Sequence, residues 1–89
     1  MKAVITVIGK DTLGIVATIS TKCFERGANI VDITQKVMRE YFTMILLVEL
    51  DALNVSFSEF SDQLAQTGAD MGLEIKVMHE DIFNSMHRI

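Results

Sequence analysis

The sequence predicts an α+β sandwich in the order βαββαβ, and three observations lead to this expectation. Segments whose apolar residues recur every second position alternate with segments of 3.6-residue spacing, which are the side-chain periods of strands and helices. Gly27 and Gly72 follow the two helical segments, where glycine commonly ends a helix. The 89 residues contain no proline and no low-complexity tract, so a single domain is expected.

The first two elements are a buried strand and an amphipathic helix. Residues 2–8, KAVITVI, form a continuous β-branched run that predicts a central strand ending at Gly9. From Leu13 the spacing becomes helical, and the helix is expected to end near Arg26. The side chains expected on its buried side are those of Leu13, Val16, Ile19, Ser20, Cys23 and Phe24.

Two further strands follow and are expected to pair as a hairpin. Residues 29–38 alternate apolar and polar side chains, as a half-exposed strand does. Residues 41–50 form the second strand, which is apolar on both faces. The link Arg-Glu-Tyr is short enough for a hairpin, although it lacks the Asn-Gly or Asp-Gly pair of the favoured turns.

The second half begins with a capped helix. Ser56 and Glu59 match the capping box, in which each side chain accepts a free backbone N–H at a helix start. The helical stripe runs to Met71, and residues 73–79 then alternate as a fourth strand. Residues 80–89 predict one more short helix with a single apolar side.

These elements predict a ferredoxin-like topology. Two right-handed βαβ crossovers interleaved by a hairpin give a four-stranded antiparallel sheet in the order 4-1-3-2, with both helices on one face. Residues 1–80 would form the domain and residues 81–89 its helical tail. Either a second subunit or the tail must cover the other apolar face. The tail residues available for this are Ile82, Phe83, Met86 and Ile89.

Composition argues against several functions. The formal net charge of −4 and the pI of 4.9, without a cluster of basic residues, argue against nucleic-acid binding. No apolar run approaches the roughly 20 residues that span a bilayer, so no membrane contact is expected. Cys23 is the only cysteine, and the first residues do not resemble a signal peptide; both observations favour a cytoplasmic location.

Catalytic, metal-binding and cofactor motifs are not found in the sequence. No nucleophile elbow and no His-Glu-x-x-His pair occurs, so no enzymatic activity, cofactor or metal is expected. The alternative is a soft-metal site or a small enzyme that uses residues near the end of the chain. Its candidate residues are Met78, His79, Met86 and His87. Residues of these types more commonly serve to pack the tail.

The stretch GKDTLGIVATIS, from Gly9 to Ser20, marks the best candidate for a binding site. A strand that ends just before a helix start presents free backbone N–H groups, which suit a carboxylate or another anion. The competing interpretation is purely structural. Asp11 or Thr12 would cap the helix, and Gly14 would allow the helix and strand to approach closely.

Three segments carry a resemblance to a known family: DTLGIVATIS, ERGANIVDITQKV and FTMILLVEL. They resemble the ACT domain, a small regulatory module that binds amino acids in many proteins. The Asp-x-x-Gly-Ile-Val form is similar to that of stand-alone bacterial ACT proteins and of glycine cleavage system repressor-like regulators. The resemblance covers residues 2–78, and the tail also resembles that of small bacterial ACT proteins.

The resemblance implies a ligand site between two subunits. The residues implicated are Asp11, Thr12, Leu13, Gly14 and Ile15, facing Asn29 and Ile30 of a neighbouring subunit. Asn29 corresponds to an asparagine that contacts the ligand. The chain departs from the effector-binding pattern at Thr12-Leu13, where many members carry Arg-Pro or Asn-Pro.

The function expected from this resemblance is regulatory. The protein would be a homodimer that binds an amino acid and transmits the change to a partner protein, without catalysis of its own. The alternative is an ACT module that takes no ligand and dimerises to assemble or regulate a partner protein.

Overall fold

The computed structural model of the chain describes residues 1–10 and 13–86. Its elements are β1 (Lys2–Lys10), α1 (Ile15–Arg26), β2 (Asn29–Met38), β3 (Tyr41–Glu49), α2 (Phe57–Met71), β4 (Leu73–His79) and α3 (Glu80–Met86). The βαββαβ order with a short final helix is therefore confirmed. Within the described residues, no helix is both long and apolar enough to cross a membrane.

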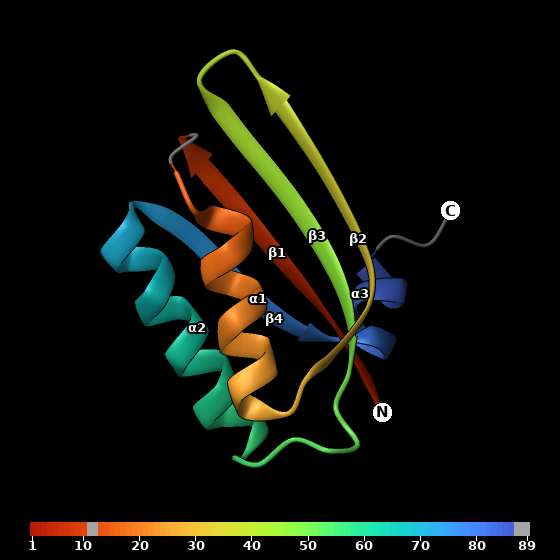
Figure 1. The fold of residues 1–89 in the computed structure, drawn as a ribbon. Helices are drawn as coiled ribbons and strands as arrows, with labels where there is room; N and C mark the ends of the chain where they lie inside the picture. The colour runs from red at the N-terminus through yellow and green to blue at the C-terminus, as the bar shows by residue number, and fades with distance from the viewer. Residues whose placement is uncertain (11–12, 87–89) are drawn as a thin grey trace.

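The sheet has the predicted topology. Its order is β2-β3-β1-β4, and every neighbouring pair is antiparallel. Helices α1 and α2 lie side by side across one face (Figure 1). The last helix, α3, packs against β1 and β4. Ala3 of β1 pairs with Val48 on one side and with His79 on the other, so the first strand lies at the centre of the sheet.

The hydrophobic core lies between this sheet and the two long helices. Alternate residues of each strand point toward the helices, as the period of two requires. The strand residues buried there include Ala3, Ile5, Val7, Met44, Leu46, Val48, Leu73 and Ile75. The helices contribute Ile15, Ile19 and Cys23 from α1, and Phe60 and Leu64 from α2.

Strand β1 does not end at Gly9, which corrects the prediction. The strand continues to Lys10, and Gly9 pairs with Phe42 of β3 and with Leu73 of β4. A Cβ atom on Gly9 would lie 2.7 Å from the side chain of Leu73. The glycine is therefore needed for close approach of β4, and it does not mark a turn.

The predicted buried side of α1 is only partly right. Its buried residues follow a single i, i+4 stripe through Ile19, whereas Leu13 is 96% exposed, Phe24 is 85% exposed and Val16 is also exposed. The sheet covers a narrower arc of the helix than the apolar residues occupy. The remaining apolar side chains therefore face solvent.

The predicted ends of both long helices and the predicted start of α2 are confirmed, whereas α1 begins at Ile15, two residues after the predicted start at Leu13. The Ser56 hydroxyl accepts the backbone N–H of Glu59 at 3.1 Å, which is one half of the capping box. Gly27 and Gly72 end α1 and α2 with φ of 80° and 73°. After α1, the N–H of Ala28 donates to the carbonyl of Cys23 at 2.9 Å, which satisfies a terminal carbonyl of the helix.

Strand β2 is an edge strand, as predicted, but its edge is modified. A register shift between Ile30 and Asp32 marks a bulge. Just beyond it, the Asp32 carboxylate accepts the backbone N–H of Ile33 at 2.8 Å. A side chain of β2 therefore already satisfies one of the strand's own backbone donors.

The β2–β3 hairpin closes through a two-residue turn. Met38 pairs with Tyr41, so Arg39 and Glu40 form the turn. Arg39 adopts a φ of 59°, a left-handed conformation that the favoured hairpin turns usually assign to glycine or asparagine. The hairpin therefore forms without the usual sequence signal.

Candidate functional site

The first half of the predicted site is the start of α1. Gly14 is the residue before the helix, with a left-handed φ of 78°, and its carbonyl accepts the N–H of Thr18 at 2.9 Å. Leu13 projects into solvent, while the Ile15 side chain is 3% exposed and packs in the core. Asp11 and Thr12, predicted as ligand-binding or capping residues, lie outside the described residues.

The second half is the start of β2. Asn29 is exposed and lines a shallow pocket of about 230 Å³ together with Phe24, Gly27 and Ala28. Ile30 packs against the hydrophobic core and is partly buried. Of the two predicted residues here, Asn29 is therefore the one whose side chain is open to a ligand.

A single subunit does not bring the two halves together. Gly14 precedes α1, whereas Asn29 follows it after the capping Gly27. The helix has 12 residues and so separates its ends by about 18 Å. A small ligand held at the start of α1 does not reach Asn29 of the same chain.

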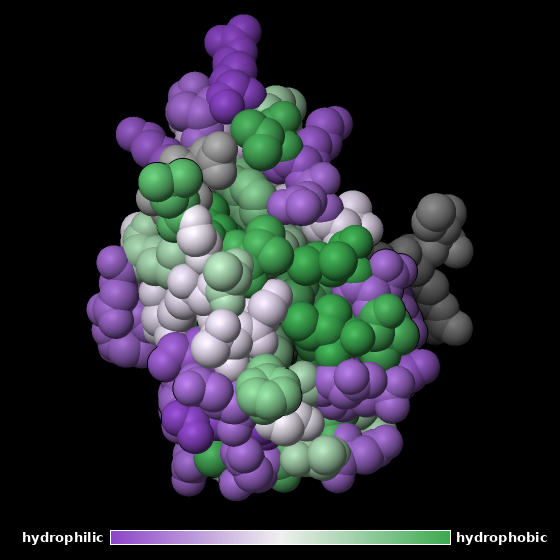
Figure 2. All heavy atoms as spheres, in the orientation of Figure 1, coloured by the Kyte–Doolittle hydropathy of each residue, from purple (hydrophilic) through white to green (hydrophobic). Residues whose placement is uncertain are grey.

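An exposed apolar surface lies between these two halves, and we call it the α1–β2 flank. The name covers four exposed apolar side chains, one just before α1, two on α1 and one on β2: Leu13, Val16, Phe24 and Ile33. Figure 2 shows apolar side chains gathered beside α1 and over β2 on this face of the molecule. Sequence reasoning assigned the α1 members to the core. The sequence does contain a signal for their exposure, which is the width of the apolar arc on this helix. The buried stripe is already complete with Ile15, Ile19 and Cys23, so further apolar side chains of the helix exceed what the sheet can cover.

Neither a reactive thiol nor a metal cluster accompanies this surface. Burial raises the pKa of the Cys23 thiol to about 11, so this side chain is uncharged at neutral pH. Among the described residues, no group of three or more His, Cys, Asp or Glu side chains is placed to hold a metal ion. The His79 Nδ1 atom accepts the backbone N–H of Asp81 at 3.2 Å. His87 lies outside the described residues.

Gly14 offers a test of what the turn before α1 requires. Among the described residues, a Cβ atom there would meet only the Thr18 hydroxyl, at 3.9 Å, so the expected close packing is not found among them and backbone conformation is the constraint. We expect Gly14→Val to lower the free energy of unfolding by about 1–2 kcal/mol. Gly14→Asn is the matched control, because asparagine tolerates the left-handed region, and it should retain most of the stability. Equal urea midpoints for the wild type and Gly14→Val would contradict this account.

Comparison with known proteins places this geometry in a family. The family model described as the ACT domain matches residues 2–78. A UPF0237 protein of Clostridium acetobutylicum is 49% identical over 89 residues, which is 100% of both chains.

Solved structures agree with this assignment. An ACT domain protein from Streptococcus pneumoniae superposes with a TM-score of 0.82 at 41% identity, covering 98% of each chain. The regulatory subunit of aspartate kinase from Thermus thermophilus gives a TM-score of 0.67 at 28% identity, over 85% of this chain and 49% of that one. A protein described as a glycine cleavage system transcriptional repressor shares the fold, with a TM-score of 0.70 at 24% identity. The match covers 85% of this chain and 43% of that one. The protein therefore belongs to the ACT domain family.

Proposed function

We propose that this protein is a regulatory homodimer that binds an amino acid between its subunits and has no catalytic activity of its own. The observation that carries the proposal is the separation of the two half-sites at opposite ends of α1. In this proposal a second subunit completes the site. The proposed location is the cytoplasm, and the bound ligand would change how the dimer contacts a partner protein.

A two-fold axis beside β2, perpendicular to the sheet, suits this requirement. Such an axis runs the two α1 helices antiparallel, so the start of each helix approaches the end of the other. Leu13 and Gly14 of one subunit then face Asn29 of the partner subunit, and two equivalent sites form. The same arrangement covers Phe24 and Ile33, which a lone subunit leaves exposed.

The chemistry of the paired half-sites suits a zwitterion. The start of α1 offers backbone N–H groups and the positive end of a helix dipole, which favour a carboxylate. The Asn29 amide supplies both a donor and an acceptor. Leu13 and Phe24 offer exposed apolar surface for the rest of the ligand. An amino acid combines these three features.

The relatives support a regulatory role. The Thermus thermophilus protein is the regulatory subunit of aspartate kinase, in its ligand-free form. The alternative function is a dimerisation module that takes no ligand. It is favoured by the α1–β2 flank, which by itself supplies apolar contact area for a partner subunit.

A thermal-shift screen of the common amino acids tests the proposal. A ligand present at 100 times its Kd stabilises the folded protein by about 2.7 kcal/mol. For a domain of this size, that corresponds to a rise in Tm of roughly 10–20 °C. Asn29→Ala should abolish the shift, while Thr21→Ala, on the outer side of α1, should preserve it. A dimer whose Tm no amino acid raises would instead support the module that takes no ligand.

A further inference from the structure

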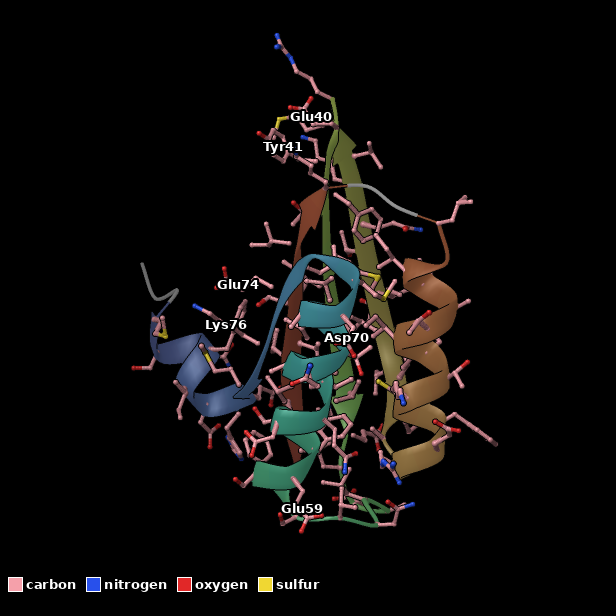
Figure 3. All side chains as sticks on the ribbon, turned by 90° about the vertical axis from the view of Figure 1, so that its left-hand side faces the viewer. Glu40, Tyr41, Glu59, Asp70, Glu74 and Lys76 are labelled. Atoms are coloured by element: carbon pink, nitrogen blue, oxygen red, sulfur yellow. The ribbon has the colours of Figure 1, made fainter. Side chains whose placement is uncertain are left out.

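A second pocket lies on the face of the sheet opposite α1 and α2. Its volume is about 380 Å³, within the range of roughly 300–1,000 Å³ typical of small-molecule sites. Its floor is formed by Thr6, Ile8 and Ile45 of the central strands. Figure 3 shows α1 and α3 on opposite sides of the sheet, with Glu74 and Lys76 on the side of α3.

The pocket exists because α3 covers only one end of this face. Val4 pairs with Met78 near α3 and is only 5% exposed. Farther along the sheet, Ile8 is 53% exposed and Ile45 is 40% exposed. The apolar floor of the pocket thus extends beyond the part of the sheet that α3 covers.

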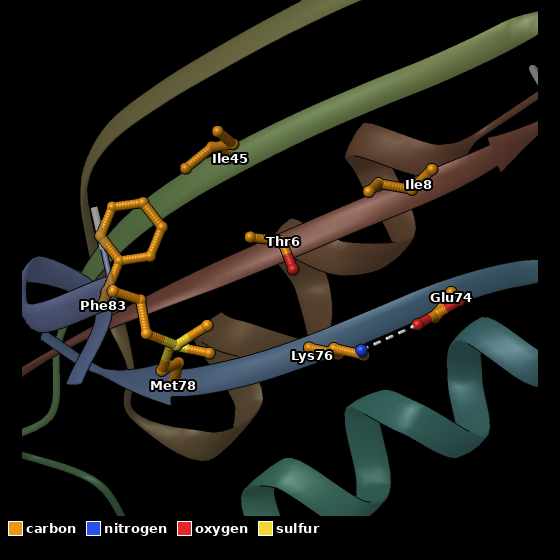
Figure 4. A pocket seen from close by; sticks show the side chains of 8 residues that line it. Thr6, Ile8, Ile45, Glu74, Lys76, Met78 and Phe83 are labelled. Atoms are coloured by element: carbon orange, nitrogen blue, oxygen red, sulfur yellow. Dashed lines mark ion pairs between the residues drawn. The ribbon is translucent and has the colours of Figure 1, made fainter.

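The wall of the pocket is adaptable and apolar. Phe83 of α3 and Met78 of β4 line it (Figure 4). Met86 of α3 is also part of the lining. Unbranched thioether side chains adjust to differently shaped apolar groups and make favourable contacts with aromatic rings. This wall therefore suits an aliphatic, thioether or aromatic side chain.

The rim carries one charge of each sign beside this floor. Lys76 and Thr6 are paired in the register, as are Glu74 and Ile8, so the two charged residues stand next to the two floor residues of β1. The Lys76 Nζ atom lies 3.1 Å from a Glu74 carboxylate oxygen, and the two side chains are 67% and 69% exposed. An exposed ion pair of this kind contributes little to stability, so its charges are readily exchanged for those of a ligand.

We propose that this pocket binds the zwitterion of an apolar amino acid. Lys76 receives the carboxylate, Glu74 receives the ammonium group, and the ligand's side chain lies between Met78, Phe83 and Met86. The site is separate from the one proposed between subunits, because it uses β1, β3, β4 and α3 and includes neither Gly14 nor Asn29. It therefore goes beyond the proposed function and is tested independently of it.

Methionine methyl NMR provides a direct test on the full chain. Titration with L-phenylalanine is expected to shift the methyl resonances of Met78 and Met86 by ring currents. The resonance of Met44, which is fully buried on the other face, should stay in place. Phenethylamine, which lacks the carboxylate, and 3-phenylpropionate, which lacks the ammonium group, should each bind about five- to ten-fold more weakly.

Variants of the charged rim separate charge recognition from simple apolar contact. Lys76→Gln and Glu74→Gln should each weaken L-phenylalanine binding about five- to ten-fold. The double exchange of Glu74→Lys with Lys76→Glu keeps both charges and should recover part of this loss. Lys36→Gln is the matched control, since Lys36 is an exposed residue of β2 that does not line the pocket. Asn29→Ala should leave the Met78 and Met86 shifts unchanged.

Three results would overturn the proposal. One is the lack of any shift at Met78 and Met86 at about 10 mM ligand, where a site with a Kd of 1 mM is nearly saturated. Another is equal binding of phenethylamine and L-phenylalanine. The third is a shift of the same two methyls with protein concentration alone, accompanied by a rise in mass, which would assign this face to a second copy of the chain.

Discussion

Phe24→Glu is expected to convert the protein from a dimer, with a mass near twice 10.0 kDa, into a monomer of 10.0 kDa. Phe24 projects from α1 on the side of the proposed contact, near the end of the helix, and is 85% exposed in the single subunit. A charge at a buried aromatic contact typically weakens association by at least about 2 kcal/mol, or roughly 30-fold in Kd. Light scattering at micromolar concentration measures the mass directly.

The design of this experiment separates assembly from folding. Because Phe24 makes little contact within its own subunit, Phe24→Glu should retain the circular dichroism spectrum of the parent protein. Thr21→Glu places the same charge on the outer side of α1 and should leave the mass unchanged. A parent mass of 10.0 kDa, or an undiminished dimer of Phe24→Glu, would contradict assembly through the α1–β2 flank.

Gly27→Ala is expected to be the most destabilising single methyl addition proposed here. The added Cβ would clash with the carbonyl oxygen of Ala52, and the φ of 80° disfavours any side chain. The loop around Ala52 has little freedom to move, since Asn54 donates to the carbonyls of Glu25 at 2.8 Å and Arg26 at 2.9 Å. Strain and overpacking together should lower the free energy of unfolding by about 3 kcal/mol or more.

Gly72→Ala is the matched control for this substitution. Gly72 ends α2 with a φ of 73°, yet a Cβ there would meet no atom of the described residues within 4 Å. Its cost should therefore be the backbone strain alone, about 1 kcal/mol. Urea unfolding at one fixed protein concentration gives both values. Equal losses for the two variants would show that the loop beneath α1 yields to the added methyl group.

Local sequence signals predicted the fold almost completely. The periodicity of residues 29–38 and 73–79 gave the bounds of β2 and β4, and Ser56 and Gly72 gave the limits of α2. Gly9 was misinterpreted, because a glycine that admits a neighbouring strand looks the same in sequence as one that ends a strand. The distinction depends on the side chain of Leu73, which is far away in the sequence.

The candidate site was harder to predict for a physical reason. Periodicity reports that one side of α1 is apolar, but not how much of that side the protein's own sheet covers. Phe24 and Leu13 therefore looked like core residues, although they face solvent. The two proposed half-sites come from the resemblance to ACT domains and stay a prediction. The structure adds that Ile15 belongs to the core and that the two halves stand at opposite ends of one helix.

The central position of β1 has a consequence for how the chain is made. Both strands that flank it are synthesised later, and the pairing of Ala3 with His79 joins the first strand to the last. During translation, β1 must wait with one edge unpaired until β4 has left the ribosome. Such long-range pairing slows folding and exposes strand edges to other chains. A growing chain of this protein thus completes its sheet only after β4 has emerged.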